Sequence, residues 1–586
     1  MLSIDEQAVL DTVNLEAPWE LIERFSTLKR EDPVDVQTAA GLIAERLRQH
    51  GIPVEVHTPD LYLSIPRKAH IEIAGRTLHA KPMAMSAIYK EGLHAPLVYQ
   101  PSAYADNADE MFTSSLLGDA VDVAGKIVVT EGFGMPGKVS ALAQRGALAV
   151  IAVNPGERAH WGICTTIWGT PDLDDLPRKP TVAVVSVNRS DGEHLIEQAK
   201  SGASATLFTD LTEGFFPSPV PVVTIPGHED PESFVLLHGH YDSWDYGVGD
   251  NAVGDATMLE VARVLWKNRH TLRRTVKIAW WPGHSTGRYA GSTWFADHFA
   301  LELHEHCVAQ INCDSPGCRW ATSYQNVSLM PETERFAAAL IHDVTGQTLH
   351  AERPHQAGDY SFNNLGLSGY FMLLSTMPDD LRAEKGYYAV GGCGGNIAWH
   401  TEDDTLEVAD REILMKDMRI YALAAYRTAN CSTVPFDFTL TLDDFSATLA
   451  RYQAAAGEGF SFDRLGQEIT ELRRQVQALN TQSARLEGQP LSTAELRAVN
   501  AAQLKLAREL VRVNFTRGHD FFHEPAESVP PLPDLAPALE LPHASSEHAG
   551  FIRTHLTRGQ NRVIASLRAA RAVVDQALLF QTPAKS

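Results

Sequence analysis

The chain has 586 residues, of which 44% are hydrophobic and 21% are charged, and its formal net charge is −23. This composition is typical of a soluble globular protein, and the length indicates roughly three to four domains of ~150 residues each. The negative charge argues against nucleic acid or an anionic membrane surface as a general partner.

The cysteines and the N-terminus indicate a cytoplasmic protein. Only six cysteines occur, with no CxxC pair, so reduced thiols are expected rather than a disulfide framework. The first residues show no signal sequence, and no apolar run approaches the ~18 residues that a membrane span requires. We expect no contact with a membrane.

Predicted elements divide the chain into four parts. Residues 1–65 are predicted to form helices followed by a strand, and residues 66–215 are rich in predicted strands. Residues 216–435 alternate strands with helices, which is typical of an α/β sheet covered by helices. Residues 436–586 are mainly helical in pattern.

A glycine-rich segment in the strand-rich part has the spacing G-x-G-x-x-G, from Gly132 to Gly137. This spacing matches a dinucleotide-binding turn, with Glu157 twenty residues further on. The surrounding chain lacks repeated βαβ units, and Pro136 removes an amide that would face phosphate. We therefore favour a glycine-rich turn in an accessory β-domain.

The helical part contains a short apolar stripe with 4-3-4-3 spacing, formed by Leu465, Ile469, Leu472, Val476 and Leu479. About two heptads are too few to predict a coiled coil. This apolar face is expected either to pack inside the domain or to contact a second subunit.

Four well-separated segments of the chain end in side chains that bind metals: His240, Asp250, Asp314 and His400. His240 and Asp314 directly follow predicted strands, as does His284, and ligands collect at the carboxyl ends of strands in such sheets. Imidazole and carboxylate groups suit zinc, and an open coordination position suits a water molecule. The sequence therefore predicts a metal-dependent hydrolase.

The same segments resemble those of the zinc-dependent aminopeptidases that include glutamate carboxypeptidase II and the transferrin receptor. The motifs, in the family's order, are His240-Tyr-Asp242, Asp250-Asn-Ala, Asn312-Cys-Asp314-Ser and His400-Thr before an acidic stretch. The resemblance covers nearly the whole chain. It implies an α/β fold: a mixed-sheet catalytic domain, a β-rich protease-associated domain and a C-terminal helical domain.

The resemblance also implies the domain boundaries and the assembly. Residues 1–65 would be the N-terminal part of the catalytic domain, and residues 66–215 the protease-associated domain. Residues 216–435 would form the metallopeptidase-like domain, and residues 436–586 a helical dimerisation-type domain. A homodimer is therefore expected.

Carried over position by position, the resemblance implies a role for each ligand. His240 and Asp314 would hold one metal, Asp250 would bridge two metals, and His400 would hold the second. Asp242 would accept a hydrogen bond from the far nitrogen of His240 and fix its tautomer. The expected cofactor is Zn²⁺, as one or two ions, with Mn²⁺ or Fe²⁺ as alternatives.

The chain departs from this family at the residues that perform catalysis. Peptide-cleaving members carry a Glu-Glu pair, in which the first glutamate is the general base and the second binds metal. Here His284 and Ser285 occupy these two positions. Three interpretations remain open: His284 is the general base, His284 is a ligand of the second metal, or the second metal is lost and the site holds one ion. Ser285 is a poor zinc ligand, so the second metal should bind more weakly.

Candidate substrate-binding residues lie in three segments. Arg288 and Tyr289 belong to the altered segment and would meet a carboxylate or an oxyanion. Ser361 lies where the family has a substrate-facing loop, and Asn396 ends a glycine-rich stretch before His400.

We predict an enzyme that hydrolyses an amide or peptide bond of a small peptide or of an N-acylated amino acid or amine, with His284 replacing the usual glutamate base. A different metal-assisted reaction on a small molecule is the first alternative, because the Glu-Glu pair is missing. A non-catalytic, receptor-like scaffold is the second.

Overall fold

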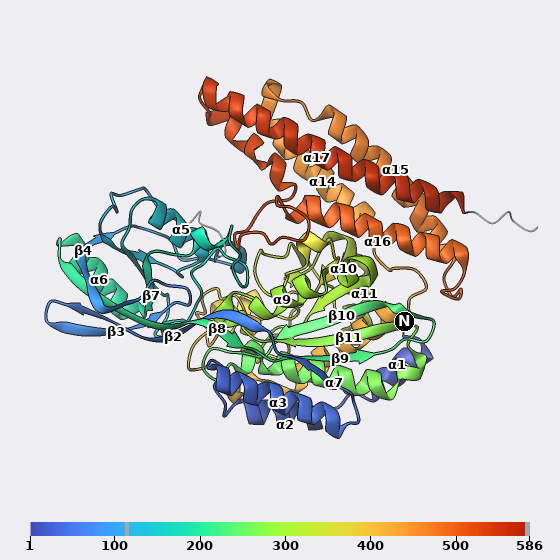
Figure 1. The fold of residues 1–586 in the computed structure, drawn as a ribbon, viewed down its shortest axis with the longest axis horizontal. Helices are drawn as coiled ribbons and strands as arrows, with labels where there is room; N and C mark the ends of the chain where they lie inside the picture. The colour runs from blue at the N-terminus through green and yellow to red at the C-terminus, as the bar shows by residue number, and fades with distance from the viewer. Residues whose placement is uncertain (1, 112–116, 581–586) are drawn as a thin grey trace, which may run out of the picture.

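A computed structural model describes residues 2–111 and 117–580 of the chain. Three structural parts are visible: a central sheet with helices on both faces, a β-barrel beside it, and a group of long helices above it (Figure 1). The mixed α/β fold with a β-rich domain and a helical C-terminal region is confirmed.

The central sheet has six strands in the order β1-β9-β11-β10-β12-β15. Four of them, β11, β10, β12 and β15, run parallel, whereas β1 and β9 are antiparallel to their neighbours. In sequence order the strands are β1 (Glu55–His57), β9 (Val220–Ile225), β10 (Asp230–His240), β11 (Arg274–Trp281), β12 (Cys307–Asn312) and β15 (Gly369–Tyr370). The middle strands are continuous apolar runs, as expected for parallel strands buried on both faces.

Successive side chains of β10 pack into two different hydrophobic clusters. Val235 and Leu237 face the helices on one side of the sheet, which include α7 (Val253–Lys267) and α13 (Arg411–Asn430). Phe234 and Leu236 face the other side, covered by α9 (Ala290–His298) and α10 (Ala300–His306). The first face also holds α1 (Ile4–Asp11), α2 (Glu16–Phe25) and α3 (Pro33–Gln49). The N-terminal helices thus belong to the sheet domain.

The second part is a closed barrel of seven strands in the order β2-β3-β7-β6-β5-β4-β8. The strands are β2 (Asp60–Ile73), β3 (Arg76–Pro82), β4 (Tyr89–Tyr99), β5 (Ile127–Glu131), β6 (Ala149–Val153), β7 (Ala183–Val187) and β8 (Ser204–Pro217). Helices α4 (Ala108–Met111), α5 (Pro136–Gln144) and α6 (Arg189–Lys200) accompany them. The barrel strands span residues 60–217, close to the predicted 66–215.

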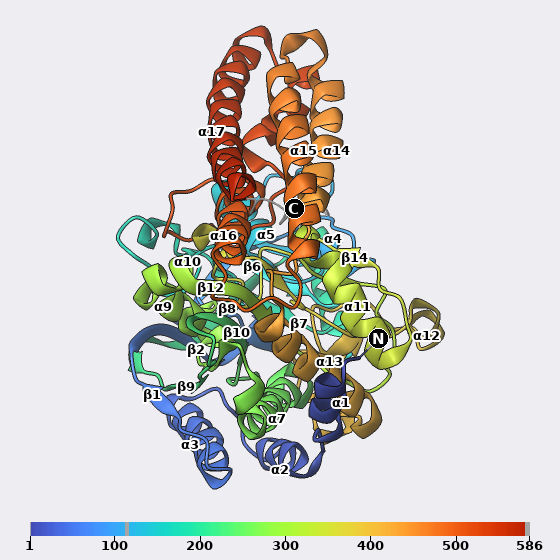
Figure 2. The same ribbon diagram turned by 90° about the vertical axis from the view of Figure 1, so that its right-hand side faces the viewer.

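The C-terminal part contains four long helices, of which one, α16 (Ala494–Phe515), lies against the sheet domain while the other three project from it (Figure 2). These three are α14 (Phe438–Ala456), α15 (Asp463–Arg485) and α17 (Ser546–Leu579). The apolar stripe from Leu465 to Leu479 on α15 is buried inside this group, so it packs within the domain. None of the helices that the structure describes combines the length and apolar character needed to cross a membrane.

Further helices and strands belong to the sheet domain. They are α8 (His284–Gly287), α11 (Glu334–Thr345), α12 (Asp379–Glu384), β13 (Val327–Ser328) and β14 (Ala351–Glu352). The single turn α8 follows β11 directly, and it carries the segment in which the catalytic pair of the family is altered.

Candidate metal centre

Strand pairing brings the predicted ligands to one edge of the sheet. His240 is the last residue of β10 and pairs with Trp281 at the end of β11, while His238 pairs with Asn312 at the end of β12. His284 and Asp314 follow these two neighbouring strands, so they lie at the same edge as His240.

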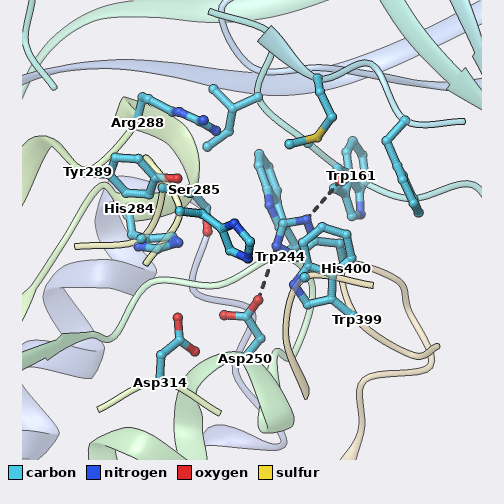
Figure 3. A pocket seen from close by; sticks show the side chains of 18 of the residues that line it. Trp161, Trp244, Asp250, His284, Ser285, Arg288, Tyr289, Asp314, Trp399 and His400 are labelled. Atoms are coloured by element: carbon cyan, nitrogen blue, oxygen red, sulfur yellow. Dashed lines mark hydrogen bonds and ion pairs between the residues drawn. The ribbon is translucent and has the colours of Figure 1, made fainter. Parts of the chain in front are cut away.

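The two carboxylate oxygens of Asp250 each approach one of the two predicted histidine ligands, and Figure 3 shows the contact with His400. Its Oδ1 is 2.9 Å from Nε2 of His240, and its Oδ2 is 3.2 Å from Nε2 of His400. Asp314 also approaches His240, with its Oδ2 3.6 Å from the same Nε2. The structure therefore brings together all four residues predicted to bind metal.

The donor set fits a cation at this point. Nε2 of His240 is fully buried and has no hydrogen-bond partner, although two carboxylates lie close to it. Burial opposes charge on Asp250, yet His240 and His400 beside it hold the pKa of this carboxyl well below its usual range. Two imidazole nitrogens and two carboxylates that converge on one region are ligands of the kind that zinc binds.

A further buried carboxylate holds the loop that carries Asp250. Asp404 accepts hydrogen bonds from the backbone N–H of Gly249 at 2.6 Å and of Asp250 at 3.0 Å. Burial raises the pKa of Asp404 to about 7. The acidic stretch after His400 was the sequence signal for this residue, but its contact with the Asp250 loop was not predicted.

His400 is fixed by the barrel domain. Its Nδ1 lies 3.0 Å from the backbone carbonyl oxygen of Trp161, and its own carbonyl oxygen accepts a hydrogen bond from the Trp161 N–H at 2.9 Å. The imidazole also stacks on the Trp399 ring, with 3.7 Å between ring centroids. Nε2 is thereby left to face Asp250.

Asp242 differs from the expectation. The backbone carbonyl oxygen of Asp242, not its carboxylate, lies 2.9 Å from Nδ1 of His240, and the nearer carboxylate oxygen is 3.8 Å away. The carboxylate instead accepts the N–H groups of His284 at 3.0 Å and Ser285 at 2.8 Å. These two amides at the start of α8 offer better donors, so Asp242 fixes the position of the altered segment.

His284 faces the metal ligands and is held from behind by Asp359. Its Nδ1 lies 3.0 Å from Oδ2 of Asp359, whose Oδ1 accepts a hydrogen bond from the Ser292 hydroxyl at 2.7 Å. Its ring stacks on the ring of His240, with 3.7 Å between centroids. His284, His240 and Asp314 each offer a ligand atom, and these atoms lie within 4.8 Å of one another. The remaining nitrogen of His284, Nε2, is thus available as a base or as a ligand.

The pairing of His284 with Asp359 was not predicted. The two residues are 75 positions apart, and the sequence indicated only that residues 359–362 form a substrate-facing loop. Burial opposes charge on the Asp359 carboxyl, but the neighbouring His284 lowers the pKa of this group below its ordinary value. Asp359 is therefore an anionic partner suited to orient an imidazole.

A largely apolar cavity adjoins the metal centre. Its wall includes Trp244 and Trp399 from the sheet domain, together with residues of the barrel domain, namely Met83, Phe133, Met135, Trp161 and Ile163. Phe133 and Met135 belong to the glycine-rich segment, which is a turn between β5 and α5 as favoured above. The barrel thus covers the metal centre and supplies part of its wall, which the sequence did not indicate.

The predicted substrate-binding residues divide into two groups. Arg288 and Tyr289 line the cavity next to His284 and Ser285. Ser361 does not line it, because its hydroxyl is engaged by Nε1 of Trp168 at 2.8 Å and by the Ser292 hydroxyl at 2.9 Å. Asn396 does not line it either: its Oδ1 accepts the Ala398 N–H at 3.0 Å and shapes the turn before His400. The expectation for these last two residues needs correction, since both have structural partners.

Asn251 ties together the two strands that carry His240 and Asp314. Its Nδ2 donates to the carbonyl oxygens of His240 at 3.2 Å and Cys313 at 2.9 Å, and its Oδ1 accepts the Ser315 N–H at 2.9 Å. This completely buried amide therefore fixes the spacing between the ends of β10 and β12.

Asn251→Ala is expected to lower the free energy of unfolding by about 2–4 kcal/mol, because it leaves buried backbone groups without their partner. Zinc affinity should fall by about 10- to 100-fold, as for other residues that orient ligands. Urea unfolding and zinc titration measure both effects. Asn480→Ala serves as the control, since its amide makes one half-buried bond to Asp437 and it lies on α15. Equal zinc affinity in the two variants would contradict the role of Asn251.

Two family models match the chain. Residues 222–424 match peptidase family M28, and residues 93–195 match the PA domain. The chain contains an M28 peptidase domain and a PA domain. These matches coincide with the sheet domain that carries the metal centre and with the barrel beside it.

The chain is similar to several known proteins. The "probable glutamate carboxypeptidase VP8" of Zea mays is 22% identical over 266 residues, covering 42% of this chain and 36% of that protein. The "probable glutamate carboxypeptidase AMP1" of Arabidopsis thaliana is 22% identical over 349 residues, covering 55% of this chain and 48% of that protein. The chain thus spans about half or less of these curated relatives.

A solved structure shows the same fold. The zinc aminopeptidase from Bacillus subtilis superposes with a TM-score of 0.51 at 21% identity, covering 70% of this chain and 94% of that one. The M28 and PA architecture expected from the sequence is therefore confirmed.

Proposed function

We propose that this M28 domain is a zinc-dependent hydrolase that cleaves an amide or peptide bond of a small peptide or of an N-acylated amino acid or amine. The observation that carries the proposal is the Asp250 carboxylate, which lies between the imidazoles of His240 and His400 and beside a cavity. Zinc suits these donors, and the structurally similar protein from Bacillus subtilis is a zinc aminopeptidase.

The residues divide between two positions for metal. His240, Asp314 and one oxygen of Asp250 would hold the first ion, and His400 with the other oxygen of Asp250 would contribute to a second. When bound, zinc would polarise the scissile carbonyl and favour deprotonation of water. Ser285 supplies no carboxylate to the second position, so this position should bind zinc more weakly.

His284 would act as the general base. The Asp359 carboxylate favours a proton on Nδ1 of His284, so that Nε2 is the acceptor on the side of the cavity. His284 would take a proton at Nε2 from the attacking water and return it to the leaving amine, while Asp359 stabilises the imidazolium. The stacked position of His284 on His240 also supports the alternative that His284 binds metal, and the variants described below separate the two.

A screen of zinc-loaded protein tests the proposed reaction. Dipeptides, N-acyl amino acids and N-acyl amines should be offered at several chain lengths, and the release of free amine should be measured. We expect turnover of small amides, because the PA domain covers the cavity and restricts access to it. An absence of turnover with every amide in zinc-loaded protein would contradict the proposal.

Ser285→Glu is expected to strengthen the second zinc position, because it restores a carboxylate where peptide-cleaving relatives have one. We expect about one tightly held zinc ion per chain in the wild type and about two in the variant. Elemental analysis after exhaustive dialysis measures the ratio. Thr286→Glu is the matched control, since it adds the same charge one residue further along the same helical turn. A second ion in the wild type, or none gained in Ser285→Glu, would contradict this view of the site.

A further inference from the structure

Arg288 is a buried cation for which the described residues provide no acceptor. It follows α8 and is only 5% exposed to solvent. Its Nε is fully buried without a hydrogen-bond partner, and within residues 2–111 and 117–580 no carboxylate forms an ion pair with it. The guanidinium contacts the face of Tyr289, with 4.9 Å between its central carbon and the ring centroid.

The other deeply buried arginines of this protein are satisfied by backbone carbonyl groups. Arg30 donates to the carbonyl oxygens of Tyr241 and Gly247, among others, and Arg274 donates to those of Cys431 and Ser432. Arg508 donates to four carbonyl oxygens, those of Leu303, His304, Gly366 and Cys307. Arg288 differs from all three, which indicates that its partner is a ligand, because buried charges are normally paired.

The position of Arg288 points to the same ligand as the metal centre. Arg288 lines the cavity together with His284, Asp250 and Asp314. Figure 3 shows its guanidinium turned toward the cavity, on the side where Tyr289 and His284 lie. In the absence of metal, the carboxylates of Asp250 and Asp314 would repel an anion from this cavity. Arg288 is a guanidinium in the cavity wall, and it supplies a permanent positive charge that would attract one.

We propose that Arg288 binds a carboxylate of the substrate, and that the preferred substrates carry this carboxylate close to the scissile amide and an apolar group beside it. A planar guanidinium binds a carboxylate through two parallel hydrogen bonds, which fixes its orientation. Trp161, Trp244 and Trp399 form the wall against which the apolar group packs. N-acyl amino acids and short peptides with apolar side chains have this chemistry. The inference rests on the proposed hydrolase function.

A binding experiment on zinc-loaded, full-length protein tests this role without catalysis. The probes are 3-phenylpropanoate and its carboxamide, titrated by the fluorescence of the tryptophans in the cavity wall. We expect the ratio of acid to amide affinity to fall by about tenfold or more in Arg288→Met, the change that a charge-assisted bidentate pair predicts. Binding of the probe carboxylate to zinc occurs in both the wild type and the Arg288 variant. It therefore cancels when their acid-to-amide affinity ratios are compared.

Two further variants complete the binding experiment. Arg158→Met is the control, because Arg158 is half exposed and paired with Asp403 on the surface, and the ratio should stay at the wild-type value. Arg288→Gln replaces Arg288→Met if the latter does not fold. An unchanged ratio in the folded Arg288 variant would overturn the proposal.

Hydrolysis gives a second, separable result. With N-acetylphenylalanine and its carboxamide as substrates, the Arg288 variant should lose the preference for the acid through a higher KM for the acid. An equal fall of kcat for both substrates would make Arg288 an oxyanion donor and overturn the proposal. If the wild type hydrolyses no amide at all, the hydrolase function fails, while the binding ratio still decides the role of Arg288.

Discussion

Replacing Asp250 with alanine is expected to remove the bound zinc and to reduce hydrolysis to the background rate. Asp250 is the residue whose two carboxylate oxygens face His240 and His400 at 2.9 and 3.2 Å. Its loss takes a ligand from both metal positions at once. Removal of a residue that only orients a ligand lowers metal affinity by about 10- to 100-fold. The loss of zinc affinity in Asp250→Ala should therefore be larger than this.

Zinc content after dialysis and zinc titration measure this effect. Asp250→Asn is the informative companion, because it keeps the size of the side chain and removes only the negative charge. Asp417→Asn is the control: Asp417 is a buried carboxylate of the same domain whose partners are Ser375, Gly317 and Tyr324. Wild-type zinc content in Asp250→Ala would refute the metal centre as described.

The sequence was sufficient to predict the edge of the sheet at which the site lies. The apolar runs of β10, β11 and β12 are recognisable as buried parallel strands, and polar side chains at the ends of such strands must share an edge. His240 and Asp314 were placed by this reasoning. Asp250 and His400 lie in loops, and only the resemblance to known ligand segments indicated their roles.

Side-chain direction within a loop was the part that sequence could not supply. Ser361 and Asp359 are two residues apart, yet Asp359 binds His284 while Ser361 faces Trp168 and Ser292. In the same way, Asn396 precedes His400 but turns to the backbone of Ala398. The loops around the site have no regular period, so a neighbour in sequence is not a neighbour in the cavity.

The contact between the barrel and the sheet domain could not be predicted from the sequence either. Trp161 contacts His400 across 239 positions, and its ring lines the cavity. A pattern of local hydrophobicity predicts a strand-rich domain, but not which of its loops covers a neighbouring site. The altered segment is the exception, because a missing carboxylate pair is visible in the sequence itself.

His284→Ala is expected to reduce kcat by about 10²- to 10⁴-fold, the range that removal of a general base produces. Zinc content should stay at the wild-type level if His284 acts as base. If His284 is instead a metal ligand, zinc affinity falls together with activity, so the two measurements distinguish the roles. Added imidazole should restore part of the activity of the alanine variant, because the cavity left behind adjoins Asp359.

Asp359→Asn separates the orientation of the base from its presence. The variant keeps the shape of the side chain but removes the anion that lies 3.0 Å from Nδ1 of His284. Since the carboxylate stabilises the imidazolium that forms when His284 takes up a proton, kcat should fall by about tenfold or more. Ser361→Ala is the control on the same loop, because its hydroxyl bonds Trp168 and Ser292 rather than the imidazole. Full activity in His284→Ala would show that this histidine takes no part in the reaction. It would also contradict the role of Asp359 as the anion that orients the base.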